Sequence, residues 1–324
     1  MSESILLLSK DQKDLDFASE VSMKLKLSLK STESPKEAMS IIAEGGVAFT
    51  MIDINNEQDY QAFEKEVTDT VGLFSDKINA NTMHFLSKKD LSQATFLLQS
   101  PLFGSFVLKN FEESKSAGNH YARVIQAHAK EKSFGLGNFF DEGVNVQKVE
   151  FQKTTQKQEA VEVVKRFLLG AKFKPRMSVV VANAVDELLM NAMFDAPVDN
   201  LGKQVYATTA RTKELILEGK SKVEMFVAYD KETIGISVVD YYGSLDRDRL
   251  LSLISKQYKE EELKVRAGVA GAGIGLSSIF NMGGSLHFSS ESHEKTEVTL
   301  FFRQANNFKD FRNQFRFLST QFYL

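Results

Sequence analysis

The sequence predicts a mixed α/β protein made of two domains, and three observations support this. The chain has 324 residues, 43% of them hydrophobic, which is enough to bury two cores. In its first third, apolar runs typical of buried parallel strands alternate with helix-compatible segments. From about residue 148 onward, two long helical segments precede strands joined by a hairpin signal, so the second domain has a different order of elements.

Residues 1–111 are expected to form an open parallel α/β domain. The apolar runs that predict its strands are 4–8, 47–52, 82–86 and 105–108. The helix-compatible segments lie between them, at about 11–24, 35–44, 57–72 and 91–99. Pro35 and the glycine pair 45–46 supply the start and stop signals of one helix. Alternation of this kind is typical of an open parallel sheet.

Residues 112–147 are expected to be a linker with one helix. The segment begins with the polar stretch 112–118 and contains one helix-like piece at 119–132. It continues into a glycine-containing loop that starts at Phe134. Because it differs from the apolar runs before it, we interpret it as the connection between two domains.

Residues 148–303 are expected to form the second domain. A strand near 148–151 leads to a helix that ends at Gly170, and Pro175 begins a second helix that reaches about Ala196. Two strands joined by residues 230–233 then form a hairpin signal. The other expected elements are the first helix at 155–169, a polar insertion at 197–220, strands at 223–229 and 234–239, a helix near 246–257, a charged segment at 258–268, a glycine turn with its helix, and strands at 285–290 and 296–302.

Residues 304–324 form an aromatic C-terminal tail. Phe308, Phe311 and Phe315 have helical spacing, and further aromatic residues follow them. We expect this tail to pack on its own domain, whereas an exposed aromatic tail would mark a surface for a partner.

Composition excludes several functional classes. The net charge is −3 at pH 7, which gives no drive toward nucleic acid or anionic membranes. The chain has no cysteine, so disulfides, thiolate metal sites and a cysteine nucleophile are excluded. The apolar run 5–8 is too short for a signal sequence or a membrane span. We therefore expect a cytoplasmic protein with neither nucleic acid nor membrane as a partner.

Three separated segments carry residue types suited to binding a nucleotide. Glu187 and Asn191 are four residues apart within a predicted buried helix, so they share one helix face. Asp240 ends the apolar run 234–239, and the segment 270–276 contains three alternating glycines. Glycines let backbone N–H groups approach phosphate oxygens, and a helix that starts there adds a favourable dipole. In this order, the three segments predict a nucleotide site.

Each pattern alone also fits a purely structural interpretation. The Glu187–Asn191 pair could belong to the solvated face of a helix, and Asp240 could be a turn residue. The glycine turn could be a tight entry into a helix. The joint occurrence of all three, in this order, favours the nucleotide-binding interpretation.

Residues 148–303 resemble the histidine-kinase-like ATPase superfamily, which includes sensor kinases, anti-sigma-factor serine kinases and gyrase-type topoisomerases. The segment 179–196 is similar to the N box of that family, and Asp240 is similar to its adenine-binding aspartate. Gly271, Gly273 and Gly275 are similar to its second glycine box. The resemblance implies a two-layer α/β sandwich that binds ATP and Mg²⁺.

The resemblance also implies a role for each matched residue. Asn191 would hold Mg²⁺, Glu187 would orient or activate the attacking group, and Asp240 would accept a hydrogen bond from the adenine amino group. The three glycines would bind the phosphates, and Thr296, in the last strand of the domain, would lie near the base. These roles are chemically consistent, because Mg²⁺ prefers hard oxygen ligands and phosphoryl transfer depends on positioning and charge neutralisation.

One part of the sequence departs from the family pattern. The first glycine box of the family reads D-x-G-x-G, but this chain has Asp240-Tyr241-Tyr242-Gly243-Ser244. Tyr242 and Ser244 fill the two glycine positions, and Gly243 between them is the remaining candidate for contact with the cofactor. A tyrosine at this position could stack on the nucleoside or block it, so the departure bears on ATP affinity.

The sequence combines features of two branches of the superfamily. A strand and a helix run directly into the N-box helix, which is the layout of the anti-sigma serine kinases, whereas the glycine turn and the residues after it look more like sensor kinases. Sensor kinases carry a phosphorylated histidine before the ATPase domain, and His120 and His128 are the candidates in this chain. Neither is followed by the acid–Arg–Pro context of that family, so the other interpretation is an exposed histidine.

Residues 3–111 resemble a response-regulator receiver domain, which has a flavodoxin-like parallel sheet. Asp53 stands where receivers carry the phosphorylated aspartate, and Ser87 and Lys109 match the switch hydroxyl and lysine. The acidic pair that binds Mg²⁺ in receivers is replaced by Ser9-Lys10, with Asp11 beyond it. Lys10 could pair with Asp53 directly and hold one state without phosphate. We favour a pseudo-receiver that binds a partner or dimerises; the alternative is that Asp53 caps a loop.

These features predict a cytoplasmic signal-transduction protein. Its kinase-like domain would bind Mg-ATP and phosphorylate a partner protein, on serine or threonine in preference to histidine, under control of the receiver-like domain. A regulatory protein would be the substrate or partner, and a homodimer is a further expectation. The alternative is a non-catalytic signalling module that acts by protein contact.

Overall fold

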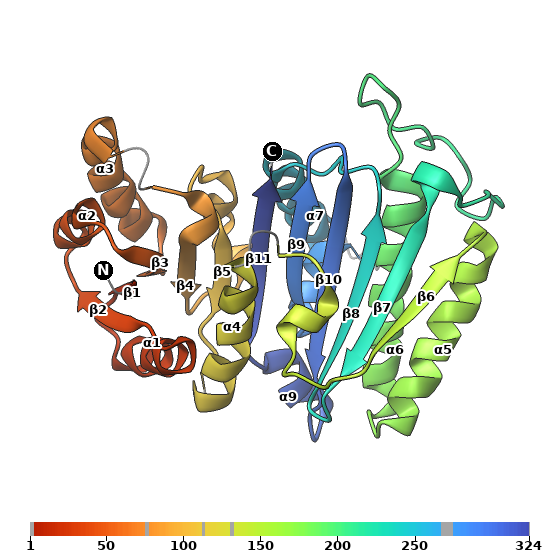
Figure 1. The fold of residues 1–324 in the computed structure, drawn as a ribbon, viewed down its shortest axis with the longest axis horizontal. Helices are drawn as coiled ribbons and strands as arrows, with labels where there is room; N and C mark the ends of the chain where they lie inside the picture. Colours follow the sequence, from red (N-terminus) through yellow and green to blue (C-terminus); the bar gives the residue numbers. More distant parts are fainter. Residues whose placement is uncertain (1–2, 75–77, 112–113, 130–132, 267–274, 324) are drawn as a thin grey trace. The chain divides into compact units, whose positions relative to one another are not determined.

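The computed structural model describes residues 3–74, 78–111, 114–129, 133–266 and 275–323 (Figure 1). The chain divides into two compact units. Unit 1 comprises Met1–Glu131 and Phe315–Thr320, and unit 2 comprises Lys132–Gln314 and Gln321–Leu324. Each unit combines helices with strands, which confirms the predicted mixed α/β class.

Unit 1 is built on a sheet whose strand order is β2-β1-β3-β4-β5-β11. Strands β1 to β5 pair in parallel, and β11 runs antiparallel along β5. Their bounds are β1 Ser4–Leu8, β2 Ser28–Thr32, β3 Val47–Asp53, β4 Met83–Ser87, β5 Ser105–Leu108 and β11 Arg316–Tyr323. The sequence did not predict β2, because its residues are mostly polar and partly exposed.

The helices of unit 1 begin at the expected capping residues. Asp11 accepts a hydrogen bond from the Lys13 N–H at the start of α1, and Ser34 caps α2 in the same way. The helices are α1 Gln12–Leu25, α2 Pro35–Glu44, α3 Glu57–Phe74 and α4 Ser114–His128. The helix expected at 91–99 is replaced by two 3₁₀ turns, η3 Leu91–Gln93 and η4 Thr95–Gln99, because Ala94 between them has non-helical backbone angles.

The segment 112–147 is divided between the two units. Helix α4 packs on α1 within unit 1, and a Cβ added at Gly118 would lie 2.7 Å from the Cβ of Glu20. His120 on this helix is only 7% exposed and packs against Phe315 and Phe317, so the expectation of an exposed histidine is wrong at this position. Residues 133–144 belong to unit 2.

The aromatic tail forms one short helix and one strand. Helix α9 (Phe308–Asn313) places Phe311 against Phe302 of unit 2, with ring centroids 5.4 Å apart. Residues 316–319 then pair with β5, and the segment 315–320 belongs to unit 1, where Phe315 packs against Phe17 and Tyr121. The tail is therefore buried, but it does not pack on one domain alone.

Unit 2 has an antiparallel sheet of strand order β9-β10-β8-β7-β6. The strands are β6 Val146–Phe151, β7 Val223–Tyr229, β8 Thr233–Asp240, β9 Ser285–Glu291 and β10 Lys295–Arg303. The helices are α5 Lys157–Gly170, α6 Pro175–Met190, α7 Arg247–Arg266 and α8 Leu276–Asn281. Helix α7 continues through most of the segment that the sequence marked as charged.

Both faces of the unit 2 sheet are covered. Figure 1 shows α5 and α6 side by side on one face, and α6 contacts β8. The turn η5 (Leu136–Phe139) lies on the same sheet, and a Cβ at Gly235 of β8 would be 2.7 Å from Phe140 and 2.9 Å from Leu136. Every residue of β8 is consequently buried, and β8 carries Asp240 at its end.

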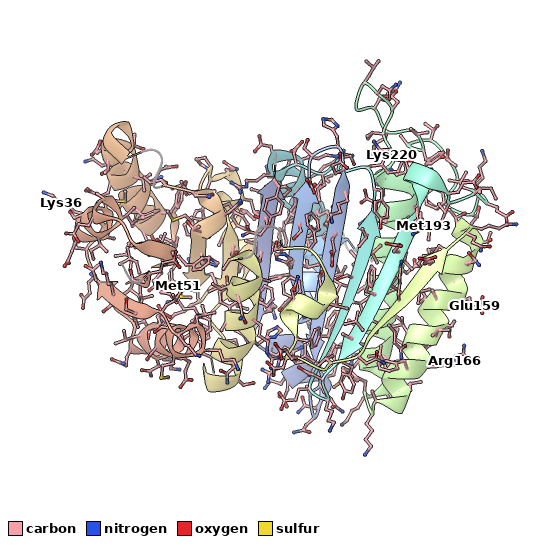
Figure 2. All side chains as sticks on the ribbon, viewed as in Figure 1. Lys36, Met51, Glu159, Arg166, Met193 and Lys220 are labelled. Carbon is pink, nitrogen blue, oxygen red and sulfur yellow. The ribbon has the colours of Figure 1, made fainter. Side chains whose placement is uncertain are left out.

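The segment Pro175–Asp195 is, among the described residues, the stretch long and apolar enough to span a membrane. However, 67% of the apolar 18-residue window in this segment is buried inside the protein, as expected for a core helix. Figure 2 shows the contrast between core and surface side chains: Met51 lies within unit 1, where it is fully buried, whereas Lys36, Glu159 and Arg166 lie at the periphery.

Candidate functional site

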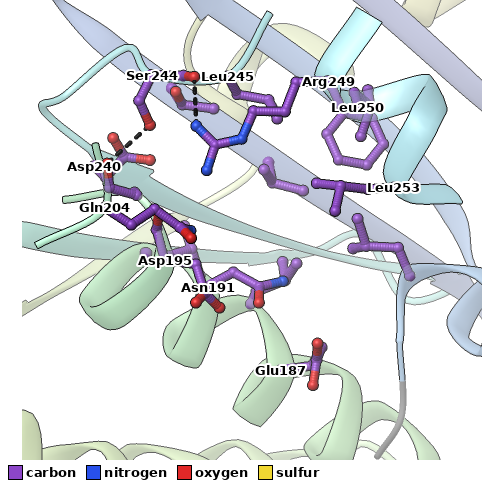
Figure 3. Close-up of a pocket in the computed structure, with 18 of the residues that line it drawn as sticks. Glu187, Asn191, Asp195, Gln204, Asp240, Ser244, Leu245, Arg249, Leu250 and Leu253 are labelled. Carbon is purple, nitrogen blue, oxygen red and sulfur yellow. Dashed lines mark hydrogen bonds between the residues drawn. The ribbon is translucent and has the colours of Figure 1, made fainter. Parts of the chain in front are cut away.

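A cavity of about 470 Å³ lies in unit 2 between the end of α6, the strands β8 and β10, and the helices α7 and α8 (Figure 3). Its apolar lining consists of Leu188, Ala192, Ala196, Val238, Leu245, Leu250, Leu253, Leu276, Phe288 and Val298. Its polar and charged lining consists of Glu187, Asn191, Asp195, Gln204, Asp240, Ser244, Arg249, Gln257 and Thr296. Such an apolar cleft with a few convergent polar groups is typical of a small-molecule site.

Four residues selected from the sequence meet in this cavity. Glu187 and Asn191 come from the end of α6, Asp240 ends β8, and Thr296 lies near the start of β10. The antiparallel pairing of β8 and β10 places Thr296 directly opposite Asp240. The sheet therefore joins two candidate base-binding residues that are far apart in the chain.

The end of α6 directs a third oxygen-bearing side chain into the cavity. The helix continues as a π turn, η7 (Asn191–Asp195), in which the N–H of Ala196 donates to the carbonyl of Asn191 at 2.8 Å. Such turns are frequent at functional sites. Asp195, four residues after Asn191, lines the cavity and was not selected from the sequence. The i, i+4 spacing that links Glu187 with Asn191 also links Asn191 with Asp195, and it could have identified Asp195 from the sequence.

Glu187 has an unusually high proton affinity for a carboxylate. Burial, followed by the charges of Asp195 and Asp186, raises the pKa of Glu187 to about 7. The charge of Arg211 and a hydrogen bond from Asn191 oppose that shift. A carboxylate whose pKa lies near neutrality is able to take and return a proton at physiological pH.

Asp240 is buried at the end of β8 and is only 5% exposed. Burial raises the pKa of Asp240 to about 7, although backbone N–H groups of Tyr242 and Gly243 donate to its carboxylate. The Tyr242 N–H lies 3.0 Å from Asp240 Oδ1. The expectation that this carboxylate needs a donor is met by the turn that follows it.

Of the three residues that follow Tyr241, Tyr242 and Gly243 lie outside the cavity lining and Ser244 belongs to it. The Tyr242 hydroxyl lies 3.1 Å from Ser221 Oγ, and its ring faces Lys220, so it is not part of the cavity lining. Gly243 is also absent from the lining. Its φ is +55°, and a Cβ there would lie 2.1 Å from the carbonyl oxygen of Glu291, so this glycine permits close contact with the β9–β10 turn. Ser244 does line the cavity and donates to the Ala196 carbonyl at 2.8 Å.

The predicted phosphate-binding glycines are only partly described. Gly271 and Gly273 lie outside the described residues. Gly275 is the N-cap of α8, and a Cβ there would lie 2.7 Å from Cδ of Gln257. Gln257 Oε1 accepts a hydrogen bond from the Ser277 N–H at 3.0 Å, so the side chain of Gln257 caps this short helix.

The described lining has more acidic than basic side chains. It contains the carboxylates of Glu187, Asp195 and Asp240, against the guanidinium of Arg249. Arg249 Nη1 donates to the Ser244 carbonyl at 3.0 Å (Figure 3). A phosphorylated ligand would therefore need further positive charge at the acidic end of the cavity.

No family model and no curated protein matches this chain.

The donor set at the acidic end suits Mg²⁺. Among the described residues, no three Asp, Glu, His or Cys side chains are grouped to hold a metal ion alone. Glu187, Asn191 and Asp195 nevertheless bring hard oxygen atoms from one helix end to the cavity (Figure 3). Mg²⁺ is commonly bound by one or two such groups together with substrate phosphates.

Unit 1 has a buried charge cluster at the ends of β3 and β5. Lys109 Nζ lies 2.5 Å from Asp53 Oδ1 and 2.5 Å from Asp14 Oδ2. Lys109 therefore forms the ion pair with Asp53 that we expected from Lys10, which is exposed. Asp14 is fully buried and was not selected from the sequence, because it lies in the first turn of α1 rather than next to β1.

The structure also describes Ser87 and Asp11, the two other residues that the sequence related to receiver domains. Ser87, at the end of β4, is fully buried, and its hydroxyl accepts a hydrogen bond from the Lys89 N–H at 3.2 Å. Asp11 caps α1 and pairs with Lys88 at 2.8 Å. Asp53 has a further partner in Asn55, whose amide lies 2.6 Å from Oδ1, so it joins a charged network in addition to ending its strand.

Proposed function

We propose that unit 2 binds Mg-ATP in the cavity and transfers its terminal phosphoryl group to a serine or threonine of a partner protein. One observation carries this proposal: Glu187, Asn191, Asp240 and Thr296, selected from the sequence for nucleotide chemistry, line the same cavity. They come from three segments that are separated along the chain, the end of α6, β8 and β10, so sequence proximity does not account for the convergence of these segments.

The end of the cavity near the sheet suits an adenine base. Asp240 presents a buried carboxylate that can accept from an exocyclic amino group, and Thr296 lies opposite it in the sheet. The aliphatic side chains of Val238 and Leu245 line the same cavity. An amino group that pairs with the Asp240 carboxylate would offset the cost of burying that charge.

The opposite end suits phosphoryl transfer. Asn191 would hold Mg²⁺, which would neutralise phosphate charge when bound. Glu187, whose pKa is raised to about 7 by burial and by neighbouring acids, would accept the proton of the attacking hydroxyl. The charges of Asp195 and Asp186 help to raise the pKa of Glu187, which makes it a stronger base.

The folds of the units fit this assignment. The antiparallel sheet of unit 2, with α5 and α6 on one face, is compatible with the sandwich that the resemblance to histidine-kinase-like ATPases implies. In unit 1, the parallel order β2-β1-β3-β4-β5 is that of flavodoxin-like and receiver domains. We infer a cytoplasmic signalling protein in which unit 1 regulates the kinase-like unit and contacts a regulatory partner or a second copy of the chain.

A non-catalytic role is favoured by a different observation, the ion pairs of Lys109. Because Lys109 already bridges Asp53 and Asp14, unit 1 holds its cluster together without a metal or a phosphoryl group. This supports a pseudo-receiver. The corresponding alternative for unit 2 is a non-catalytic module that acts by protein contact.

Calorimetric titration with Mg-ATP and Mg-ADP tests the proposal. Asp240→Asn is expected to abolish binding of both, and Asn191→Ala to weaken the Mg-dependent part for ATP. Asn183→Ala, an exposed asparagine on the same helix, is the matched control and should bind like the unaltered protein. Absence of heat and of thermal stabilisation at millimolar nucleotide would leave the contact module as the better description.

A further inference from the structure

The carboxylate of Asp240 does not by itself decide which purine binds in the cavity. A carboxylate accepts hydrogen bonds from the 6-amino group of adenine, and it accepts equally from the N1–H and 2-amino groups of guanine. The two bases differ at position 6, where adenine carries an amino donor and guanine a carbonyl acceptor. A second acceptor close to Asp240 would therefore distinguish them, because the two N–H groups of the adenine amino group can serve both acceptors.

Gln204 supplies such an acceptor. Its side chain lines the cavity, and its Nε2 lies 2.9 Å from the carbonyl oxygen of Asp195. A carbonyl oxygen can only accept, so this contact fixes the amide with its nitrogen toward Asp195. Among the described residues, Gln204 Oε1 has no hydrogen-bond partner. The amide oxygen is therefore available to a ligand.

Gln204 lies at the same end of the cavity as Asp240. Ser244, in the turn after Asp240, donates from its hydroxyl to the Ala196 carbonyl at 2.8 Å. Gln204 donates to the carbonyl of Asp195, the residue immediately before Ala196. Figure 3 shows Gln204 and Asp240 on the same side of the cavity. The two acceptors therefore converge on the end assigned to the base.

The backbone around Gln204 holds this acceptor in place. Gln204 forms an antiparallel bridge with Val198, and the Val205 N–H donates to the Pro197 carbonyl at 2.9 Å. The chain thus folds back on itself just after the π turn. Because both the backbone and the amide nitrogen are fixed before a ligand binds, ordering this side chain costs little on binding.

We propose that Gln204, together with Asp240, selects adenine nucleotides over guanine nucleotides. This inference rests on the proposed function of the cavity. One N–H of the adenine 6-amino group donates to the Asp240 carboxylate, and the other donates to Gln204 Oε1. Guanine in the same position would place its O6 against two acceptors and leave both unpaired, which is costly in a partly buried site. A site built to hydrogen-bond a substrate amino group rejects an analogue that lacks it.

The first test compares the affinities of Mg-ATP and Mg-GTP for Gln204→Met, Lys203→Met and the unaltered protein. Methionine has a similar length, but its thioether is only a weak acceptor. We expect Gln204→Met to lower the ratio of the ATP affinity to the GTP affinity roughly 10- to 100-fold, chiefly through weaker ATP binding. Lys203 is an exposed neighbour outside the cavity lining, so Lys203→Met is the matched control and should keep the ratio.

Gln204→Glu separates the acceptor from the anchoring contact. Glutamate keeps an acceptor but, when ionised, cannot donate to the Asp195 carbonyl. This variant should keep the preference for ATP, although the lost anchor and the added charge lower the affinity for both nucleotides. If Gln204 only supported the backbone, both variants would weaken both nucleotides alike and leave the ratio unchanged. Adenosine and guanosine should give the same ratios, because the contact involves the base alone.

The outcomes separate this inference from the proposed function. If the unaltered protein prefers Mg-ATP and Gln204→Met keeps that preference, the role of Gln204 is wrong and the nucleotide site stands. Equal affinities of the unaltered protein for Mg-ATP and Mg-GTP would overturn the selection of adenine and also leave the site standing. If the unaltered protein binds neither nucleotide, the proposed function fails, and this inference fails with it.

Discussion

Glu187 and Asp240 are carboxylates that stand near the midpoint between charged and neutral at physiological pH. Burial is the first cause of the raised pKa in both residues, which brings each to about 7. Their surroundings differ: Glu187 has two acidic neighbours, whereas Asp240 receives backbone N–H groups. We assign them different roles for this reason, proton transfer to Glu187 and recognition to Asp240.

Replacement of Glu187 by glutamine tests its role as a base. Glu187→Gln is expected to lower the rate of phosphate release from Mg-ATP by about 100-fold or more, because a positioned base contributes roughly that factor. The dissociation constant of Mg-ATP should change little. In the unaltered protein the rate should rise with pH through about 7, where Glu187 loses its proton, and the variant should lack this rise.

The control for this variant is the neighbouring acid. Asp186 pairs with Lys157, lies outside the cavity lining, and its charge helps to raise the pKa of Glu187. Asp186→Asn should therefore keep the activity and move the pH midpoint downward. Equal losses of activity in the two variants would argue against Glu187 as the base.

The raised pKa of Asp240 leads to a prediction about stability as well as binding. The folded protein keeps a proton on Asp240 up to about pH 7, whereas the unfolded chain releases it near 3.8. The contribution of this group to the free energy of unfolding is thus fully present below pH 3.8 and is lost as the pH rises through about 7. Asp240→Asn cannot ionise, so at pH 8 it should be more stable than the unaltered protein, by on the order of 1–4 kcal/mol.

Urea unfolding at pH 5 and pH 8 provides the measurement. The advantage of Asp240→Asn should be larger at pH 8, and exposed Asp248→Asn, at the start of α7, should show no such difference. A variant that is more stable and yet binds no nucleotide would show that the binding loss is not a folding defect. A variant that is less stable at pH 8 would contradict the assignment of a raised pKa.

At the scale of elements, the sequence predicted those with strong hydrophobic patterns and missed those whose position depends on tertiary contacts. The buried strands β1, β4 and β8 and the core helix α6 were predicted, because apolar runs and capping signals specify them locally. Strand β2 was missed, because an edge strand needs few apolar residues. The π turn at Asn191 was also missed, since an inserted residue in a helix leaves no periodic signal.

The residues of the candidate site likewise divide into those that the sequence predicted and those that it missed. Glu187, Asn191, Asp240 and Thr296 were found because each sits at the end of, or within, a strongly patterned element. Asp195 and Arg249 were not found. Asp195 was missed although its i, i+4 spacing from Asn191 could be read in the sequence, whereas Arg249, in the first turn of α7, reaches the cavity through packing that sequence spacing does not specify.

Gly243 gives a prediction at this scale, because it connects the end of β8 with the turn between β9 and β10. Gly243→Ala would place a Cβ 2.1 Å from the Glu291 carbonyl oxygen at a φ of +55°. We expect it to lower the free energy of unfolding by about 2 kcal/mol or more, since both strain and a backbone clash oppose it.

Gly202→Ala is the matched control for that change. Gly202 has a φ of +76°, but a Cβ there would meet no atom within 4 Å. It should cost about 1 kcal/mol or less, because only the backbone conformation is strained. Chemical denaturation of both variants measures the difference, and equal losses would show that the contact with the β9–β10 turn contributes nothing.

At the scale of the whole molecule, the chain passes from one unit to the other more than once. Unit 1 includes residues 315–320, which follow nearly all of unit 2 in the sequence. These residues pair with β5 through four registered positions, and Ser319 Oγ lies 2.9 Å from Ser105 Oγ. Unit 1 is therefore incomplete without the end of the described chain.

Removal of residues 315–324 tests this arrangement. The deletion exposes the apolar edge of β5, which is a template for pairing with another chain. We expect faster amide exchange in β5 and concentration-dependent association on size exclusion. Leu318→Ala in the full chain is the milder comparison and should affect stability without causing association. Unchanged exchange in β5 after the deletion would mean that β11 does not protect it.

The pairing of β5 with β11 also sets an order of events during synthesis on the ribosome. The partner of Ser105 lies 214 residues further along the chain and is therefore synthesised much later than β1 to β4. At about 5–20 residues per second, this delay amounts to tens of seconds. During that time a nascent chain would present a bare sheet edge, so its folding yield should depend on a chaperone that covers such edges until β11 emerges.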